Sequence, residues 1–289
     1  MAGRNFSISL GVNHYSDPLL GELSYAESDA RTIYELARDK LRYGDRAILL
    51  AQSTNSVEFM KQLSGFVKSH AIKVQDRVVL YFAGHGMQSG NKDHLLLLSQ
   101  AQVTPLRAGR ETNNDFLSVR ALLDDLDQFY AEFVLVLDAC RQPPGTQDDN
   151  EVYGSVESTL AGLAAREIQF VFEDRKPAKK STQRSHAKEG ARATRHLIVN
   201  SCGDRGRAHE VGTLGKGLFA GALSAWMRES AEAGRSAVID RSTVNDLGQR
   251  MQAMAEGVGI QVRQEPWISD PKRGFVLYIP SNSDASCSA

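Results

Sequence analysis

Two apolar runs that each end in a reactive side chain constrain the fold of this chain more than any other feature. Residues 78–86 read VVLYFAGHG and residues 133–141 read FVLVLDACR. Continuous runs of this kind are typical of strands that are buried on both faces of a parallel sheet. Ligands of open α/β sheets bind beyond the carboxyl ends of the strands, so two neighbouring strands would bring His85 and Cys140 to one edge.

A cysteine and a histidine at one sheet edge predict nucleophilic catalysis, with Cys140 as nucleophile and His85 as general base. A thiol attacks as its thiolate, and a nearby imidazole can take the proton. Gly84 and Gly86 allow the backbone around His85 to bend sharply and to approach a substrate. We expect the backbone N–H groups of Gly86 and Cys140 to stabilise a developing oxyanion.

The rest of the chain alternates strands with helices, which indicates an α/β fold with right-handed crossovers. Apolar residues either recur at helical spacing or form short runs. Helices are predicted at about 25–42, 56–69, 117–129, 218–233 and 243–256, and further strands at 7–15 (with the following loop), 47–51, 94–98, 196–202 and 274–279.

Composition excludes several classes of protein. A chain of 289 residues with 42% hydrophobic content can bury one large core, and a net charge of −1 favours neither nucleic acid nor an anionic membrane as a partner. The sequence has no bilayer-spanning apolar stretch and no signal-peptide pattern, so we expect a cytoplasmic protein. Its three cysteines, Cys140, Cys202 and Cys287, do not form the pattern of a disulfide framework.

The spacing of the two reactive residues resembles that of a known family. His85 and Cys140 are 55 positions apart, and caspases carry their histidine about 50 residues before the cysteine. From residue 7 to about residue 280 the chain resembles the caspase-like cysteine peptidases of family C14, and within them the metacaspases, orthocaspases and paracaspases. The resemblance implies a caspase-like (caspase-hemoglobinase) fold, a mostly parallel six-stranded sheet with helices on both faces. By analogy alone it also implies a prokaryotic source.

The same resemblance implies how the chain is divided. Residues 1–141 correspond to the large half with the His-Cys dyad, and residues 196–280 to the small half that completes the substrate groove. Residues 142–195 read as a mobile linker because they are poor in apolar residues and end in a basic stretch. The polar tail at 281–289 is predicted to be disordered.

The resemblance also identifies the substrate pocket. Caspases have glutamine two positions before the nucleophile, in a basic pocket for aspartate, whereas this chain has Asp138. Metacaspases and paracaspases pair that aspartate with a second acidic residue, and Asp29 matches its position. Two carboxylates in a partly desolvated pocket favour a cationic side chain. We therefore expect an endopeptidase that cleaves proteins after Arg or Lys.

A protease with this preference would find cleavage sites in its own linker. The candidate self-cleavage residues are Arg175, Lys176, Lys179, Lys180, Arg184, Lys188, Arg192 and Arg195. A solvated loop that is never cut is the alternative.

Other functions stay open beside the active peptidase. The chain could be a catalytically silent caspase-like interaction module, a zymogen that an upstream partner protein activates, or a related Cys-His hydrolase. Metacaspases usually have His-Ser-Gly after the nucleophile, where this chain has Arg141-Gln142-Pro143. The sequence does not decide between monomer and dimer.

No metal or cofactor is expected, although calcium dependence is an alternative. Asp115 and Asp148 lie near the positions of calcium-binding aspartates in metacaspases, but Asn114 replaces one of that set. The other histidines are scattered without metal-ligand spacing, and the sequence assigns no site to His14, His70, His94, His186, His196 or His209.

Three further features are predicted to be structural. The glycine-rich stretch 212–217 lacks the Gly-Lys-Ser/Thr ending of a phosphate loop and reads as a surface turn. Cys202 and Trp267 are expected in the core or in the wall of the groove.

Overall fold

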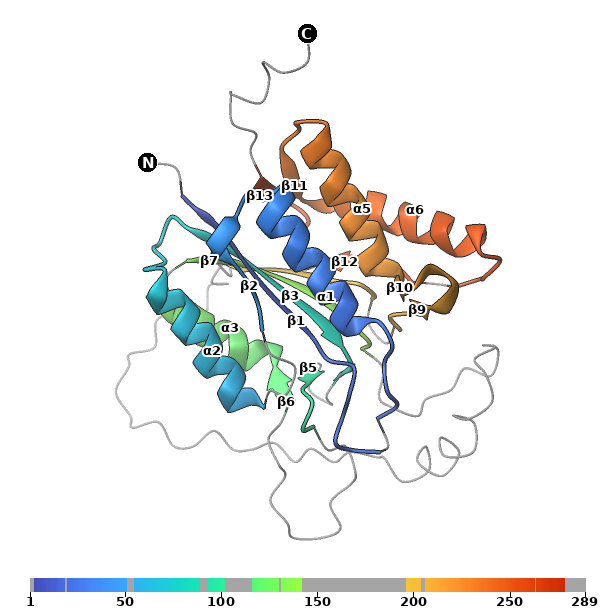
Figure 1. Ribbon diagram of the computed structural model, residues 1–289, viewed down its shortest axis with the longest axis horizontal. Helices are drawn as coiled ribbons and strands as arrows, with labels where there is room; N and C mark the ends of the chain where they lie inside the picture. The colour runs from blue at the N-terminus through green and yellow to red at the C-terminus, as the bar shows by residue number, and fades with distance from the viewer. Residues whose placement is uncertain are drawn as a thin grey trace.

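A central sheet of six strands organises the molecule (Figure 1). The computed structural model describes residues 3–18, 20–50, 55–88, 93–101, 116–129, 131–141, 196–203, 206–262 and 264–278. The expected linker at 142–195, with every candidate self-cleavage residue, lies outside these residues, as do Asp115 and the tail at 281–289.

The strand order of the sheet is β12-β8-β7-β3-β1-β2. The strands are β1 (Asn5–Gly11), β2 (Ala47–Leu49), β3 (Arg77–Gly84), β7 (Glu132–Ala139), β8 (Leu197–Asn200) and β12 (Trp267–Ile268). All neighbours run parallel except β12, which is antiparallel to β8. The expected mostly parallel, six-stranded sheet is therefore confirmed.

Helices cover both faces of this sheet (Figure 1). On one face lie α1 (Ala26–Glu35), its π-helical extension η1 (Leu36–Lys40), α5 (Leu218–Glu232) and α6 (Arg241–Gly257), and on the other lie α2 (Ser56–Ser69) and α3 (Val119–Leu126). Side chains of β3 alternate between the two: Tyr81 packs in the first core and Leu80 in the second. Burial on both faces explains why the strands read as continuous apolar runs.

Small sheets extend the central one. The first consists of β4 (Gly86–Gln88), β5 (His94–Leu97) and β6 (Phe116–Ser118), the second of β9 (Glu210–Val211) and β10 (Lys216–Gly217), and the third of β11 (Ala237–Ile239) and β13 (Phe275–Tyr278).

Two boundaries differ from the sequence-based expectation. The helix predicted at 117–129 begins only at Val119, because the Ser118 side chain accepts a hydrogen bond from the Ala121 N–H and caps it, while 116–118 pair with β5. The last predicted strand forms as β13 but pairs with β11, so β12 takes the outer position of the central sheet.

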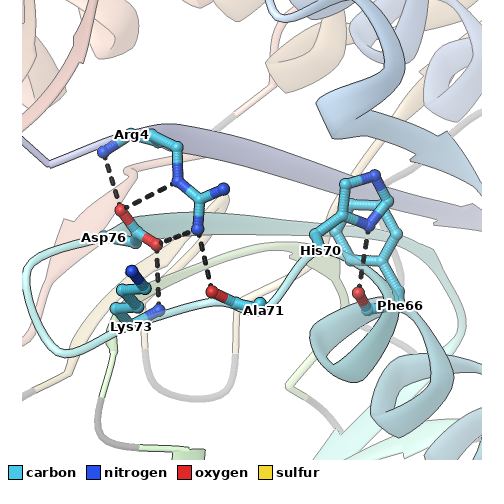
Figure 2. A network of polar contacts seen from close by, with 6 residues as sticks. All are labelled: Arg4, Phe66, His70, Ala71, Lys73 and Asp76. Atoms are coloured by element: carbon cyan, nitrogen blue, oxygen red, sulfur yellow. Dashed lines mark hydrogen bonds and ion pairs between the residues drawn. The ribbon is translucent and has the colours of Figure 1, made fainter.

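A buried carboxylate ties the amino ends of the strands together (Figure 2). Asp76 accepts hydrogen bonds from the Arg4 main-chain N–H at 2.8 Å, from the Arg4 guanidinium at 2.7 Å and from the Lys73 N–H at 2.9 Å. The Arg4 guanidinium also donates to the Ala71 carbonyl at 2.9 Å. Since the Glu132 N–H donates to the Asp76 carbonyl, the network joins β1, the turn before β3, and β7.

None of the helices in the described ranges is long and apolar enough to cross a membrane.

Candidate active site

The two residues predicted to react follow neighbouring strands. β3 and β7 pair in parallel with Gly84 opposite Ala139, so His85 and Cys140 are the first residues beyond the ends of adjacent strands. Asp138 is the second-to-last residue of β7, and its side chain faces the α1 side of the sheet, beside Tyr81. The sheet register therefore places an imidazole, a thiol and a carboxylate at one edge.

The imidazole of His85 is oriented by two residues of the connection between β1 and α1, Gly21 and Tyr15. Its Nε2 lies 2.7 Å from the Gly21 carbonyl oxygen. A carbonyl only accepts, so Nε2 carries the proton, and Nδ1 of the neutral ring is left as the basic nitrogen. The His85 main-chain N–H donates to the Tyr15 hydroxyl at 2.7 Å, and that hydroxyl donates to the Val12 carbonyl. The Tyr15 ring lies against the imidazole, with 4.8 Å between ring centres.

The half-buried thiol of Cys140 contacts Ala208, in the segment that follows β8. The Ala208 N–H lies 3.3 Å from Sγ, and the Ala208 carbonyl oxygen lies 3.7 Å from it. Burial raises the pKa of this thiol above its ordinary value, and the nearby Asp138 carboxylate adds to the effect, although the Ala208 N–H opposes it. Cys140 therefore rests as a neutral thiol near pH 7, and its reaction requires a base.

Gly86 lies directly against the backbone that follows β7. A Cβ atom at Gly86 would come within 2.6 Å of the Cys140 carbonyl oxygen and 2.9 Å of the Ala139 Cβ. Only glycine fits this approach. The contact brings the Gly86 main chain beside Cys140, while the oxyanion role of the two N–H groups stays a prediction.

Asp29 and Asp138 lie in one buried site. Their side chains come from α1 and β7, and the residues are only 4% and 8% exposed. One oxygen of each carboxylate lies within 3.3 Å of the point that a Cβ at Gly217 would occupy. Gly217 donates its N–H to Asp29 Oδ2 at 2.8 Å, and the Tyr81 hydroxyl donates to Asp138 Oδ2 at 3.4 Å.

Both of these buried carboxyls bind protons more tightly than an exposed aspartate does. Burial, reinforced by the charge of Asp138, raises the pKa of Asp29 to about 7. Burial also raises the pKa of Asp138 to about 6, with a smaller contribution from the charge of Glu210. A cation placed between the two would stabilise both ionised forms.

The β9–β10 hairpin completes this site. The sequence analysis named both aspartates but did not predict the part that this hairpin takes. It contains the glycine-rich stretch that was predicted to be only a surface turn, yet Gly217 at its end is buried against Asp29. At its start, the Glu210 carboxylate accepts from the N–H groups of Ser24 and Tyr25, both at 2.8 Å, and so binds the beginning of α1. No local signal marks these contacts, because hairpin and helix are far apart in the sequence.

The remaining candidates lie as follows. Cys202 is buried, and burial raises its pKa to about 12, so it belongs to the core. Trp267, expected in the core or in the wall of the groove, lies on the edge strand β12 and is 44% exposed, so the core position is wrong; the Arg141 guanidinium lies 5.9 Å from its ring centre. Within the described residues, no group of three or more His, Cys, Asp or Glu side chains is arranged to hold a metal ion.

Comparisons with known proteins agree with this architecture. The caspase domain family matches residues 5–276. Among solved structures, caspase-1 from Spodoptera frugiperda is similar with a TM-score of 0.56 and 12% identity, over 96% of this chain and 92% of that one. The protein GSU0716 from Geobacter sulfurreducens is similar with a TM-score of 0.55 and 15% identity, over 97% and 96% of the two chains.

At these identities the two structures show a shared fold and nothing finer. A search of curated proteins found no match. The family match spans nearly the whole chain, including both strands that lead into His85 and Cys140. The chain therefore belongs to the caspase domain family, the C14 family of cysteine peptidases.

Proposed function

We propose that this protein is an endopeptidase that cleaves after Arg or Lys, with Cys140 as nucleophile and His85 as general base and acid. Membership of the family supports a cysteine peptidase. The shared sheet edge and the Nε2-protonated form of His85 support this division of roles.

The hydrogen bond from His85 Nε2 to the Gly21 carbonyl suggests the order of proton transfers. Nδ1 of His85 takes the Cys140 proton, and the thiolate attacks the substrate carbonyl carbon. When the tetrahedral intermediate collapses, the peptide C–N bond breaks and the imidazolium protonates the leaving amine. His85 then deprotonates a water that hydrolyses the thioester, and the proton returns to the sulfur. The N–H groups of Gly86 and Cys140 would bind the oxyanion in both steps.

The observation that carries the specificity is the buried pair of Asp29 and Asp138. The carboxyls of Asp29 and Asp138 both lie beside Gly217 and have raised pKa values, so a cation that enters this site would stabilise their ionised forms. A guanidinium can bind both carboxylates, whereas an aspartate side chain would be repelled. This supports a preference for Arg, with Lys as the second substrate.

Peptide reporters test the proposal directly. Purified protein is incubated with reporters that end in Arg, Lys or Asp, with and without calcium, beside Cys140→Ala and the matched variant Cys202→Ala. We expect turnover of the Arg and Lys reporters that is lost in Cys140→Ala and retained in Cys202→Ala. Asp138→Asn should reduce Arg turnover at least about tenfold. Equal turnover of the Asp reporter would contradict the pocket assignment.

The same samples examine self-processing on a gel. A band split within 175–195, absent from Cys140→Ala, would support cleavage after the basic residues there. An uncut chain that hydrolyses the reporters would contradict it.

A second candidate is a latent enzyme that a partner protein activates. The low exposure of both pocket carboxylates favours it, because a substrate side chain would need the pocket to open. Covalent labelling of Cys140 by an arginyl electrophile, without turnover of any reporter, would identify this form. Absence of both labelling and turnover would indicate the silent interaction module.

A further inference from the structure

The hairpin that follows His85 contacts the main chain of both members of the dyad. β4 begins at Gly86 and pairs with β5 in antiparallel fashion, with Gly86 opposite Leu96. In the return strand the Leu97 N–H donates to the His85 carbonyl at 2.9 Å. The first residue of that strand, His94, contacts the main chain of Cys140, the other member of the dyad.

His94 is a buried histidine, 5% exposed, whose Nε2 lies 3.2 Å from the Cys140 carbonyl oxygen. That oxygen only accepts, so the imidazole donates from Nε2. Burial, together with the charge of Arg141, lowers the pKa of His94 to about 4. The ring is therefore neutral near pH 7 and acts as a hydrogen-bond donor, without taking part in proton transfer.

The peptide group after the nucleophile is held at both of its ends. His94 binds its carbonyl oxygen, and on the other end the Arg141 N–H donates to the Gly206 carbonyl at 3.0 Å. One contact comes from the hairpin beside His85 and the other from the small half of the chain. The rotation of the Cys140 backbone, and with it the direction of the thiol, is thereby restricted.

The lack of a side chain at Gly86 makes room for this contact. A Cβ there would come within 2.8 Å of His94 Nε2 and 2.6 Å of the Cys140 carbonyl oxygen. The glycine beside His85 thus lets imidazole, carbonyl and hairpin backbone converge at one point.

We propose that His94 is a positioning residue, which fixes the Cys140 backbone through its Nε2–H so that Sγ is held in its reactive orientation. The inference rests on the proposed role of Cys140 as nucleophile. It assigns His94 no contact with the substrate. Its effect should therefore appear in kcat, while KM is largely unchanged.

Two substitutions of His94 separate positioning from packing. His94→Met fills the space with an apolar side chain of similar length and removes the donor, whereas His94→Gln keeps an N–H donor near the place of Nε2. The matched control is His196→Met. His196 is equally buried, 3% exposed, and also binds β7, at the Phe133 N–H, but at the opposite end of that strand. Thermal unfolding of each variant reports its folded fraction.

Reporter hydrolysis and alkylation of Cys140 by iodoacetamide are measured per folded molecule, with Cys140→Ala as background. Misplacement of a reacting group can cost about 100-fold, so His94→Met should lower kcat by about 10- to 100-fold, with KM within about twofold. Alkylation should slow in the same variant. His94→Gln should recover kcat to within about fivefold of the parent, and His196→Met should retain it.

The inference is overturned if His94→Met keeps the parental kcat, if His94→Gln is as slow as His94→Met, or if His196→Met loses as much kcat. Failure of the underlying function gives a different result, because the parent protein itself would then show neither turnover nor selective alkylation of Cys140. A parent that is active beside an unaffected His94→Met variant rejects the positioning role alone.

Discussion

Replacing Asp29 with asparagine tests whether the acidic pocket destabilises the free protein. Burial raises the pKa of Asp29 from 3.8 to about 7. Between these values the unfolded chain has lost the Asp29 proton, while the folded protein retains it. Stability therefore falls as pH rises through this window, and most of the loss is complete near pH 7. An asparagine does not ionise, so Asp29→Asn should lack this dependence.

The size of the effect follows from the pKa difference. About 3 pKa units at about 1.36 kcal/mol each correspond to about 4 kcal/mol of unfolding free energy. Roughly 1 kcal/mol of this is lost below pH 4.5, which leaves about 3 kcal/mol between pH 4.5 and pH 8. The carboxyls of Asp29 and Asp138 titrate as a pair, so the double variant should change stability by less than the sum of the single variants.

Urea unfolding at pH 4.5, 6 and 8 measures the dependence. All variants carry Cys140→Ala, which prevents self-cleavage. The control is Asp124→Asn, which removes an exposed carboxylate on α3. From pH 4.5 to pH 8, the unfolding free energy of Asp29→Asn should rise by about 3 kcal/mol relative to that of the parent. The difference in unfolding free energy between the control and the parent should stay constant over the same range. Parallel curves for Asp29→Asn and its parent would refute the reasoning.

Further predictions concern the dyad, the pocket and the base of the sheet. Tyr15→Phe removes the hydroxyl that accepts the His85 N–H, so kcat should fall about tenfold with KM unchanged in reporter assays; an unaltered kcat would show that the ring contact suffices. For an Arg reporter, kcat/KM should fall as pH drops from 8 to 5, because the pocket carboxyls take up protons; a steeper fall for an uncharged reporter would contradict this. Gly86→Ala should abolish turnover, since the added Cβ would clash with the carbonyl oxygen of Cys140. Full activity would mean that the β4–β5 backbone shifts to make room for it. Asp76→Asn should lower the unfolding free energy by about 2–3 kcal/mol in urea titrations and leave kcat intact.

Local patterns in the sequence were sufficient for most of the fold. The helix predicted at 56–69 forms with those bounds, because Asn55 caps it through the Glu58 N–H and its apolar residues share one face. The two apolar runs form adjacent strands. The pairing of β13 with β11 could not be predicted, because both are short and strand partners are chosen by tertiary packing.

The site was less accessible to sequence reasoning. The positions of Asp29 and Asp138 came from a family resemblance, and the structure brings them together. Tyr15 and His85 are 70 positions apart, and Gly217 and Asp29 are 188 apart, so no periodicity connects them. His94 was dismissed as one of several scattered histidines, because a contact with a main-chain oxygen leaves no spacing signal.

The division of the pocket between distant segments has a consequence for what proteolysis can do. Asp29 and Asp138 precede the basic stretch, while Gly217 and the Ala208 contact to the thiol follow it. β8 lies in the sheet beside β7, and Glu210 binds the start of α1. Two fragments produced by a cut between them would remain interlocked as a noncovalent heterodimer. Neither fragment alone would hold all the residues of the proposed substrate pocket, so activity would depend on fragment concentration once the two had been separated.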